Sequence, residues 1–163
     1  MGSRFIARPL AVLAGVLLVG TLTTLPAQAA TRDWGPLYVS IPRGDRQAEA
    51  SGTAGWRDGQ PYVWARFRDY NGTGDNDLTF VQAAFYKYES WVCGPNGFRC
   101  YGYRLQDTKR TAAMTYDTKW HTNVVRLGHQ ATGSWKVRAR ICDQDQLTKH
   151  LQCSPWTRYM RVH

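Results

Sequence analysis

The feature that most constrains the fold of this chain is a strict alternation of apolar and polar side chains in two segments. In segment 135–142, Lys136, Arg138 and Arg140 are interleaved with the apolar residues Trp135, Val137, Ala139 and Ile141. Segment 62–70 repeats the pattern, with Val63, Ala65 and Phe67 on one side. A period of two places successive side chains on opposite faces of a sheet. Both segments are therefore predicted to be strands with one buried and one solvated face.

The rest of the chain indicates further short strands separated by turn residues. We expect strands at 37–41, 78–91, 101–105, 122–127 and 155–162. Segment 47–55 is small and polar, which predicts a loop or a weak edge strand, and 106–116 is expected to be loop or at most a short helical turn. No stretch has apolar residues at helical spacing over several turns. The prediction is an all-β, antiparallel sandwich of about seven strands.

The end of the chain resembles the last two strands of an immunoglobulin-like or fibronectin-like sandwich. Segment 133–142 corresponds to the penultimate strand, and Ser154, Pro155 and Trp156 open the last one. Arg140 stands two residues before Cys142, where true immunoglobulin domains carry the tyrosine of the tyrosine corner. The resemblance therefore implies a sandwich of this general kind and not a true immunoglobulin domain.

Residues 1–29 have the composition of a secretory signal peptide. Arg4 and Arg8 form a positive start, an apolar run spans 10–19, and the small residues Ala27 and Ala29 precede the expected cleavage before Ala30. The apolar run is shorter than the roughly 20 residues that a membrane-spanning helix needs. We expect a secreted protein with a single domain at 30–163 and no membrane span after cleavage.

The four cysteines are expected to form two local disulfides. Cys93 and Cys100 flank a Gly-Pro-Asn-Gly turn, and Cys142 and Cys153 flank the loop between the last two strands. Secretion provides the oxidising compartment in which disulfides persist. Zinc is the alternative, but the sequence has no Cys-x-x-Cys pair and no histidine at ligand spacing.

A basic and aromatic sheet face is the first candidate site. If the apolar residues of 135–142 face the core, then Lys136, Arg138 and Arg140 form a row on the outside. Neighbouring strands would add Tyr86 and Tyr88 on one side and Tyr159 and Arg161 on the other. Guanidinium groups bind carboxylate, sulfate or phosphate, and flat aromatic rings stack on planar ligands. The alternative is a solvated face on which long basic side chains cover aromatic edges.

Acidic residues in two loops form the second candidate site. Asp75 and Asp77 follow the strand at 62–70, and Asp143 and Asp145 follow the strand at 135–142. Carboxylate oxygens at one end of a sandwich could bind calcium, the one cofactor that the sequence leaves open. The alternative is a set of polar turns stabilised by side-chain to backbone hydrogen bonds.

The formal net charge of +9 invites a nucleic-acid-binding interpretation, but secretion and the scattered charge argue against a specific nucleic-acid partner. The first functional hypothesis is a binding module for an extracellular polysaccharide, wall polymer or protein. The second is an enzyme inhibitor that acts through a disulfide-closed loop, 93–100 or 142–153. The third is a small hydrolase, although no serine elbow or metal-binding histidine pair is present.

Overall fold

The computed structural model describes residues 31–40, 46–70, 77–113 and 118–163, which leaves the predicted signal peptide and Asp75 outside the described residues. The described residues form nine strands and no helix. The strands are β1 (Arg32–Ser40), β2 (Arg46–Arg57), β3 (Gln60–Asp69), β4 (Asp77–Val92), β5 (Arg99–Arg110), β6 (His121–Arg126), β7 (Trp135–Asp145), β8 (Leu151–Cys153) and β9 (Met160–Arg161). The predicted all-β class is confirmed.

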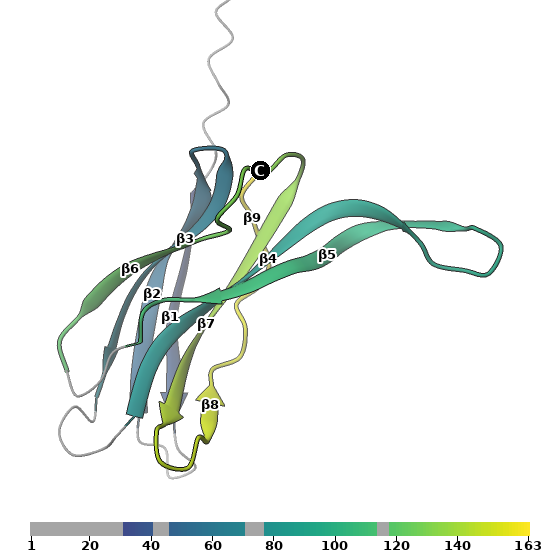
Figure 1. The fold of residues 1–163 in the computed structure, drawn as a ribbon. Coiled ribbons are helices and arrows are strands. Elements are labelled where there is room, and N and C mark those ends of the chain that lie inside the picture. The colour runs from purple at the N-terminus through teal and green to yellow at the C-terminus, as the bar shows by residue number, and fades with distance from the viewer. Residues whose placement is uncertain (1–30, 41–45, 71–76, 114–117) are drawn as a thin grey trace, which may run out of the picture.

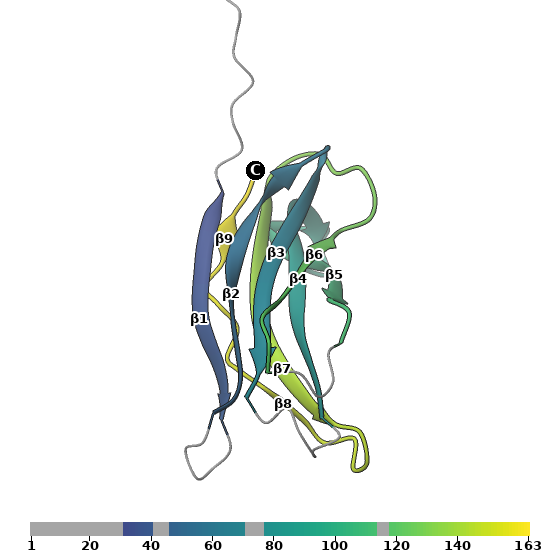
Figure 2. The ribbon, with the colours of Figure 1, turned by 90° about the vertical axis from the view of Figure 1, so that its left-hand side faces the viewer.

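The strands form two antiparallel sheets that face each other (Figures 1 and 2). The first sheet has the order β1-β2-β3-β6. The second has the order β5-β4-β7-β8, and the short β9 also pairs with β7. Strand β7 packs against β1, β2 and β3 across the interface between the sheets. The arrangement agrees with the predicted sandwich.

The alternating segments produce the core in the way that the sequence predicts. Val63, Ala65 and Phe67 of β3 are buried, and the intervening side chains of β3 are more exposed. In β7 the apolar set Trp135, Val137, Ala139 and Ile141 is buried and the basic set is only half-buried. One buried cluster contains side chains from both sheets, so the inner faces form a continuous apolar layer.

Segments 47–55 and 106–110 differ from expectation. The first is no loop or weak edge but the middle of β2, a 12-residue strand that pairs with β1 on one side and β3 on the other. Its inward side chains are small: Ala48, Ala50 and Ala54 are fully buried. The second segment continues β5 as far as Arg110 without a helical turn. The small or polar side chains of these two segments give no strand signal in the sequence. Pairing with neighbouring strands, and not local propensity, makes them strands.

Strands β4 and β5 continue well beyond the two layers as a hairpin arm, which we define as residues 88–103. Figure 1 shows the arm extending away from the sandwich. Its strands stay in register as far as the Val92–Arg99 pair. The Cys93–Cys100 disulfide lies at the end of the arm, where it closes the turn.

Both predicted disulfides are confirmed, since Cys93 is bonded to Cys100 and Cys142 to Cys153. The second joins β7 to β8, whose Cys142 and Cys153 are direct register partners. Two disulfides are compatible with an extracellular protein. The described part of the chain holds no helix with the length and apolar character needed to cross a membrane.

Candidate functional site

In the described strands β4, β5, β7 and β9, the outer face of the second sheet carries cations and no carboxylates. In the register of β4, β5, β7 and β9, this face holds six basic residues: Arg99, Arg110, Lys136, Arg138, Arg140 and Arg161. The acidic residues of the same strands fall on the opposite parity and therefore on the other side: Asp77, Glu89, Asp107, Asp143 and Asp145. We call the outward surface around Lys136, Arg138 and Arg140 the cationic face.

Aromatic rings separate the cations of this face. Lys136 Nζ lies 4.0 Å from the ring centre of Tyr103 and 5.7 Å from that of Tyr159. The Arg138 guanidinium lies 4.8 Å from the Tyr159 ring, and that of Arg140 lies 4.4 Å from the Trp156 ring. Each contact is within the range of a cation–π interaction. The alternating rings hold three like charges in fixed positions along one strand.

The predicted neighbours of this row lie where the sequence places them. Tyr86 is the register partner of Lys136, and its ring contacts Tyr159 edge-on with 5.0 Å between the ring centres. Arg161 is the register partner of Lys136 on the other side and is exposed. Tyr88 lies farther out, at the start of the arm, where it contacts Tyr103. The face therefore brings together every residue of the first candidate site, with Tyr88 at its edge.

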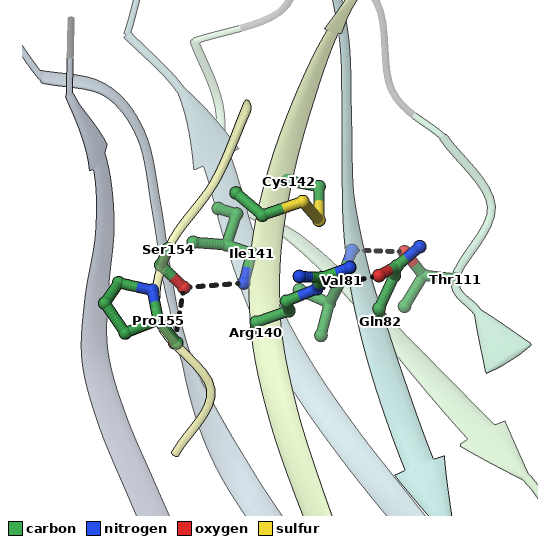
Figure 3. Close-up of a disulfide and its surroundings, with 9 residues drawn as sticks. Val81, Gln82, Thr111, Arg140, Ile141, Cys142, Ser154 and Pro155 are labelled. Carbon is green, nitrogen blue, oxygen red and sulfur yellow. Dashed lines mark hydrogen bonds between the residues drawn. A yellow bond between two sulfur atoms is a disulfide. The ribbon is translucent and has the colours of Figure 1, made fainter. Parts of the chain in front are cut away.

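Arg140 is half-buried in the outer face of the sheet. Burial lowers the pKa of its guanidinium, and its Nε donates a hydrogen bond of 2.8 Å to the side-chain oxygen of Gln82 (Figure 3). Arg138 Nε donates to the main-chain oxygen of Thr157 at 2.9 Å. Within the described residues, neither arginine has a carboxylate oxygen within 4.0 Å. Two partly desolvated cations therefore lack a counter-charge in this part of the chain.

Irregular backbone after β8 positions Trp156 and Tyr159. Figure 3 shows Ser154 beside β7, where its hydroxyl accepts a 3.2 Å hydrogen bond from the Ile141 backbone N–H. The Ser154 and Thr157 backbone N–H groups donate to the carbonyl oxygens of Ile141 and Ala139, both at 2.9 Å. Ser154 and Thr157 thus attach this segment to β7, and the segment's side chains Trp156 and Tyr159 lie over the arginines.

Sequence reasoning missed Trp156 and Tyr103 as parts of the face. In the expected regular last strand, Trp156 would face the side opposite to Tyr159, because the two residues are an odd number of positions apart. Tyr103 comes from β5, which pairs with β4 and not with β7. Its long reach to Lys136 across the intervening strand could not be predicted without the sheet order.

The outer face of the first sheet is also basic and aromatic, and two of its cations are ion-paired. Arg68 forms a 2.9 Å ion pair with Glu49, and Arg126 forms one of 3.1 Å with Asp58. A shallow hollow of about 160 Å³ on this face is lined by Thr53, Arg57, Tyr62, Trp64, Val124 and Arg126. Arg66 of the same face lies 4.2 Å from the ring centre of Trp120 and has no carboxylate oxygen within 4.0 Å in the described part of the chain. The carboxylates beside the other arginines make this face a weaker candidate for an anionic ligand than the cationic face.

The carboxylate of Glu49 should make the stability of the fold depend on pH. Burial raises the pKa of this carboxyl, but hydrogen bonds from Tyr70 and Arg68 outweigh burial and hold the pKa below its ordinary value of 4.5. A carboxyl with a depressed folded pKa stabilises the fold above its unfolded pKa and loses that contribution as pH falls.

We therefore expect Glu49→Gln to flatten the acid limb of the stability curve between about pH 5 and pH 3. Urea unfolding at a series of pH values measures this slope. Equal slopes for the variant and the wild type would show that the Glu49 network contributes no pH-dependent stability.

Three of the four predicted calcium residues lie around one hollow at the end of the sandwich. The hollow has a volume of about 160 Å³ and is lined by Gln47, Asp77, Asp143, Asp145, His150 and Gln152. Asp143 accepts a 3.1 Å hydrogen bond from the Thr79 hydroxyl, and Asp145 accepts from the Thr148 hydroxyl at 2.7 Å. In the ranges that the structure describes, no three acidic, histidine or cysteine side chains are placed to share a metal ion.

Comparison of the chain with protein-family models, curated proteins and solved structures found no match. Its functional interpretation therefore depends on the geometry and charge of its own surfaces.

Proposed function

We propose that this protein is a secreted, immunoglobulin-like binding module that recognises an extracellular polyanion through its cationic face. The observation that carries the proposal is the half-buried pair Arg138 and Arg140, which has no counter-charge among the described residues. A partly buried cation without a counter-charge is costly, and an anionic ligand would offset that cost.

The chemistry of the face fits carboxylated, sulfated or phosphorylated ligands. Arginine presents a planar fork of donors that matches such groups in two-point contacts. The Nε atoms of Arg138 and Arg140 are already engaged with Thr157 and Gln82, which fixes the orientation of each guanidinium plane. Guanidinium groups that are already fixed lose less conformational entropy when a ligand binds, so binding is less unfavourable in entropy than with mobile side chains.

The proposal is tested by retention of the oxidised mature domain on immobilised heparin in a salt gradient. We expect Arg138→Gln/Arg140→Gln to elute at clearly lower salt than the wild type. The dependence of affinity on salt should also become shallower, because each lost contact to an anionic group removes a released counterion. Thermal unfolding of the same samples establishes that the variant remains folded.

The matched control is Arg57→Gln/Arg126→Gln, which also removes two positive charges, but from the outer face of the first sheet. It should elute close to the wild type. If both double variants lose retention equally, binding follows net charge and the cationic face has no special role. Greater loss in the control would assign the ligand to the first sheet.

The end of the arm supports a second candidate function, an inhibitor that inserts a disulfide-closed loop into an enzyme. The Cys93–Cys100 loop stands clear of the sandwich, and Phe98 and Val92 beside it are 68% and 65% exposed. The Cys142–Cys153 disulfide instead joins two paired strands of the sheet. An inhibitor would lose its effect on a secreted hydrolase in Phe98→Ser, whereas a polyanion-binding module would keep its retention on heparin.

A further inference from the structure

The cationic face continues without interruption onto the arm. Tyr86 pairs with both Lys136 of β7 and Leu105 of β5, so these three side chains share one side of the sheet. The same parity then places Tyr88 opposite Tyr103, and Val92 opposite Arg99. Because cross-strand partners share a face, the outward surface of the body and one surface of the arm are the same surface.

Exposed apolar side chains concentrate on this surface. Nine large hydrophobic side chains are exposed among the described residues, and five belong to it: Tyr88, Val92, Tyr101, Leu105 and Tyr159. Tyr101 is 64% exposed and Val92 65%, so neither has a packing partner that covers it. Isolated apolar side chains on a surface are ordinary, but a contiguous row of them marks an interaction site.

The opposite surface of the arm is closed by its own contacts. The ring of Trp91 lies over Gly102, where a Cβ atom would come within 3.2 Å of it. The Arg104 guanidinium lies 5.3 Å from the Trp91 ring centre and 3.8 Å from a carboxylate oxygen of Glu89. On that side Arg104 therefore contacts both Trp91 and Glu89, whereas Val92 and Tyr101, on the side that continues the cationic face, are exposed.

Building on the proposed function, we infer that the ligand is an extended acidic polysaccharide that runs from the cationic face along the arm. From Gln82, beside Arg140, to Val92 the strand rises up to about 33 Å, enough for several sugar units of a linear chain. The arginines and Lys136 would bind the acidic groups, and the apolar faces of the sugar rings would pack on the exposed tyrosines. Arg99 supplies a further cation beside Val92, at the far end.

The charge of the surface decides against a second copy of this chain as the occupant. Among the residues that the structure describes, each copy would present the same cations and no carboxylates on this side, so two copies would repel each other. The tyrosines argue for rings in the ligand, since a polyphosphate without rings would use the cations alone. Single-stranded nucleic acid also has rings and charges, and the experiment below separates it from a polysaccharide.

The test is calorimetric titration of the mature domain with size-defined heparin fragments, from disaccharide to dodecasaccharide. We expect wild-type affinity to rise at least tenfold between the shortest fragment that binds and the dodecasaccharide. In Val92→Ser/Tyr101→Ser, short fragments should bind as they do to the wild type, while most of the gain with length is lost. The control Leu147→Ser/Leu151→Ser removes two exposed apolar side chains elsewhere and should keep the full gain.

The outcomes separate this inference from the proposed function. If Val92→Ser/Tyr101→Ser follows the wild type at every length, the ligand ends on the sandwich and the inference is wrong while the proposed function stands. If no fragment binds the wild type, both are wrong. Tighter binding of oligothymidylate than of heparin fragments with equal charge would replace the polysaccharide with single-stranded nucleic acid. Unchanged thermal unfolding in both variants excludes misfolding as the cause of a loss.

Discussion

Gly52→Ala is expected to lower the free energy of unfolding by about 3 kcal/mol. Gly52 lies in β2 between Trp34 of β1 and Ala65 of β3. A Cβ atom there would come 2.1 Å from the carbonyl oxygen of Trp64 and 2.7 Å from the ring of Trp34. Neither neighbour can yield easily, because one is backbone of a paired strand and the other is a buried ring.

Urea unfolding measures this effect as a fall in the midpoint at an unchanged m value. Gly94→Ala is the matched control, since its Cβ would meet only ordinary contacts with Phe98 at 3.6 Å or more. We expect the control to change stability by less than about 0.5 kcal/mol. If Gly52→Ala were equally neutral, the close approach of Trp34 to β2 would not be a real constraint on the fold.

Phe85→Ala is expected to destabilise the protein by about 3–5 kcal/mol. Phe85 is fully buried within the cluster that joins the two sheets, and its removal leaves a cavity that rigid strands cannot fill. Its neighbour in sequence, Tyr86, lies on the outer face. A loss of this size approaches the whole stability of many domains, so part of the population should be unfolded at 37 °C.

Differential scanning calorimetry of the oxidised protein tests this expectation. Val92→Ala on the arm is the control, because Val92 is 65% exposed and its truncation opens no cavity in the core. A similar fall in melting temperature for both variants would mean that the arm packs against the body. The disulfides must be intact in every sample, since their reduction would destabilise the fold independently.

How much of the candidate site could be predicted depended on sheet order. Alternation in 135–142 was enough to place Lys136, Arg138 and Arg140 on one outward face. In the structure the ring of Tyr86 contacts that of Tyr159, and the Tyr159 ring lies beside Arg138. The parity that puts every acid of β4, β5 and β7 on the other side became visible only with the register between strands. Binding by this face stays a proposal.

The local pattern of the sequence determined the strands whose alternation is strong and the disulfides whose cysteines flank short turns. A period of two is a property of the chain itself, and a short loop brings its two cysteines together in almost any fold. Both kinds of feature were therefore predictable. The tertiary structure alone decided what local pattern does not encode.

Strand β2 is the clearest case. Its inward side chains are alanine and glycine, which give little apolar signal, yet they are buried because Trp34 and the second sheet approach closely over them. The same holds for the arm, whose length depends on β4 and β5 staying paired after the sandwich ends. It holds also for Trp156, which reaches Arg140 because hydrogen bonds to β7 place an irregular segment there. Each depends on a partner distant in sequence, so the physical cause lies in packing and pairing and not in the residues' own propensities.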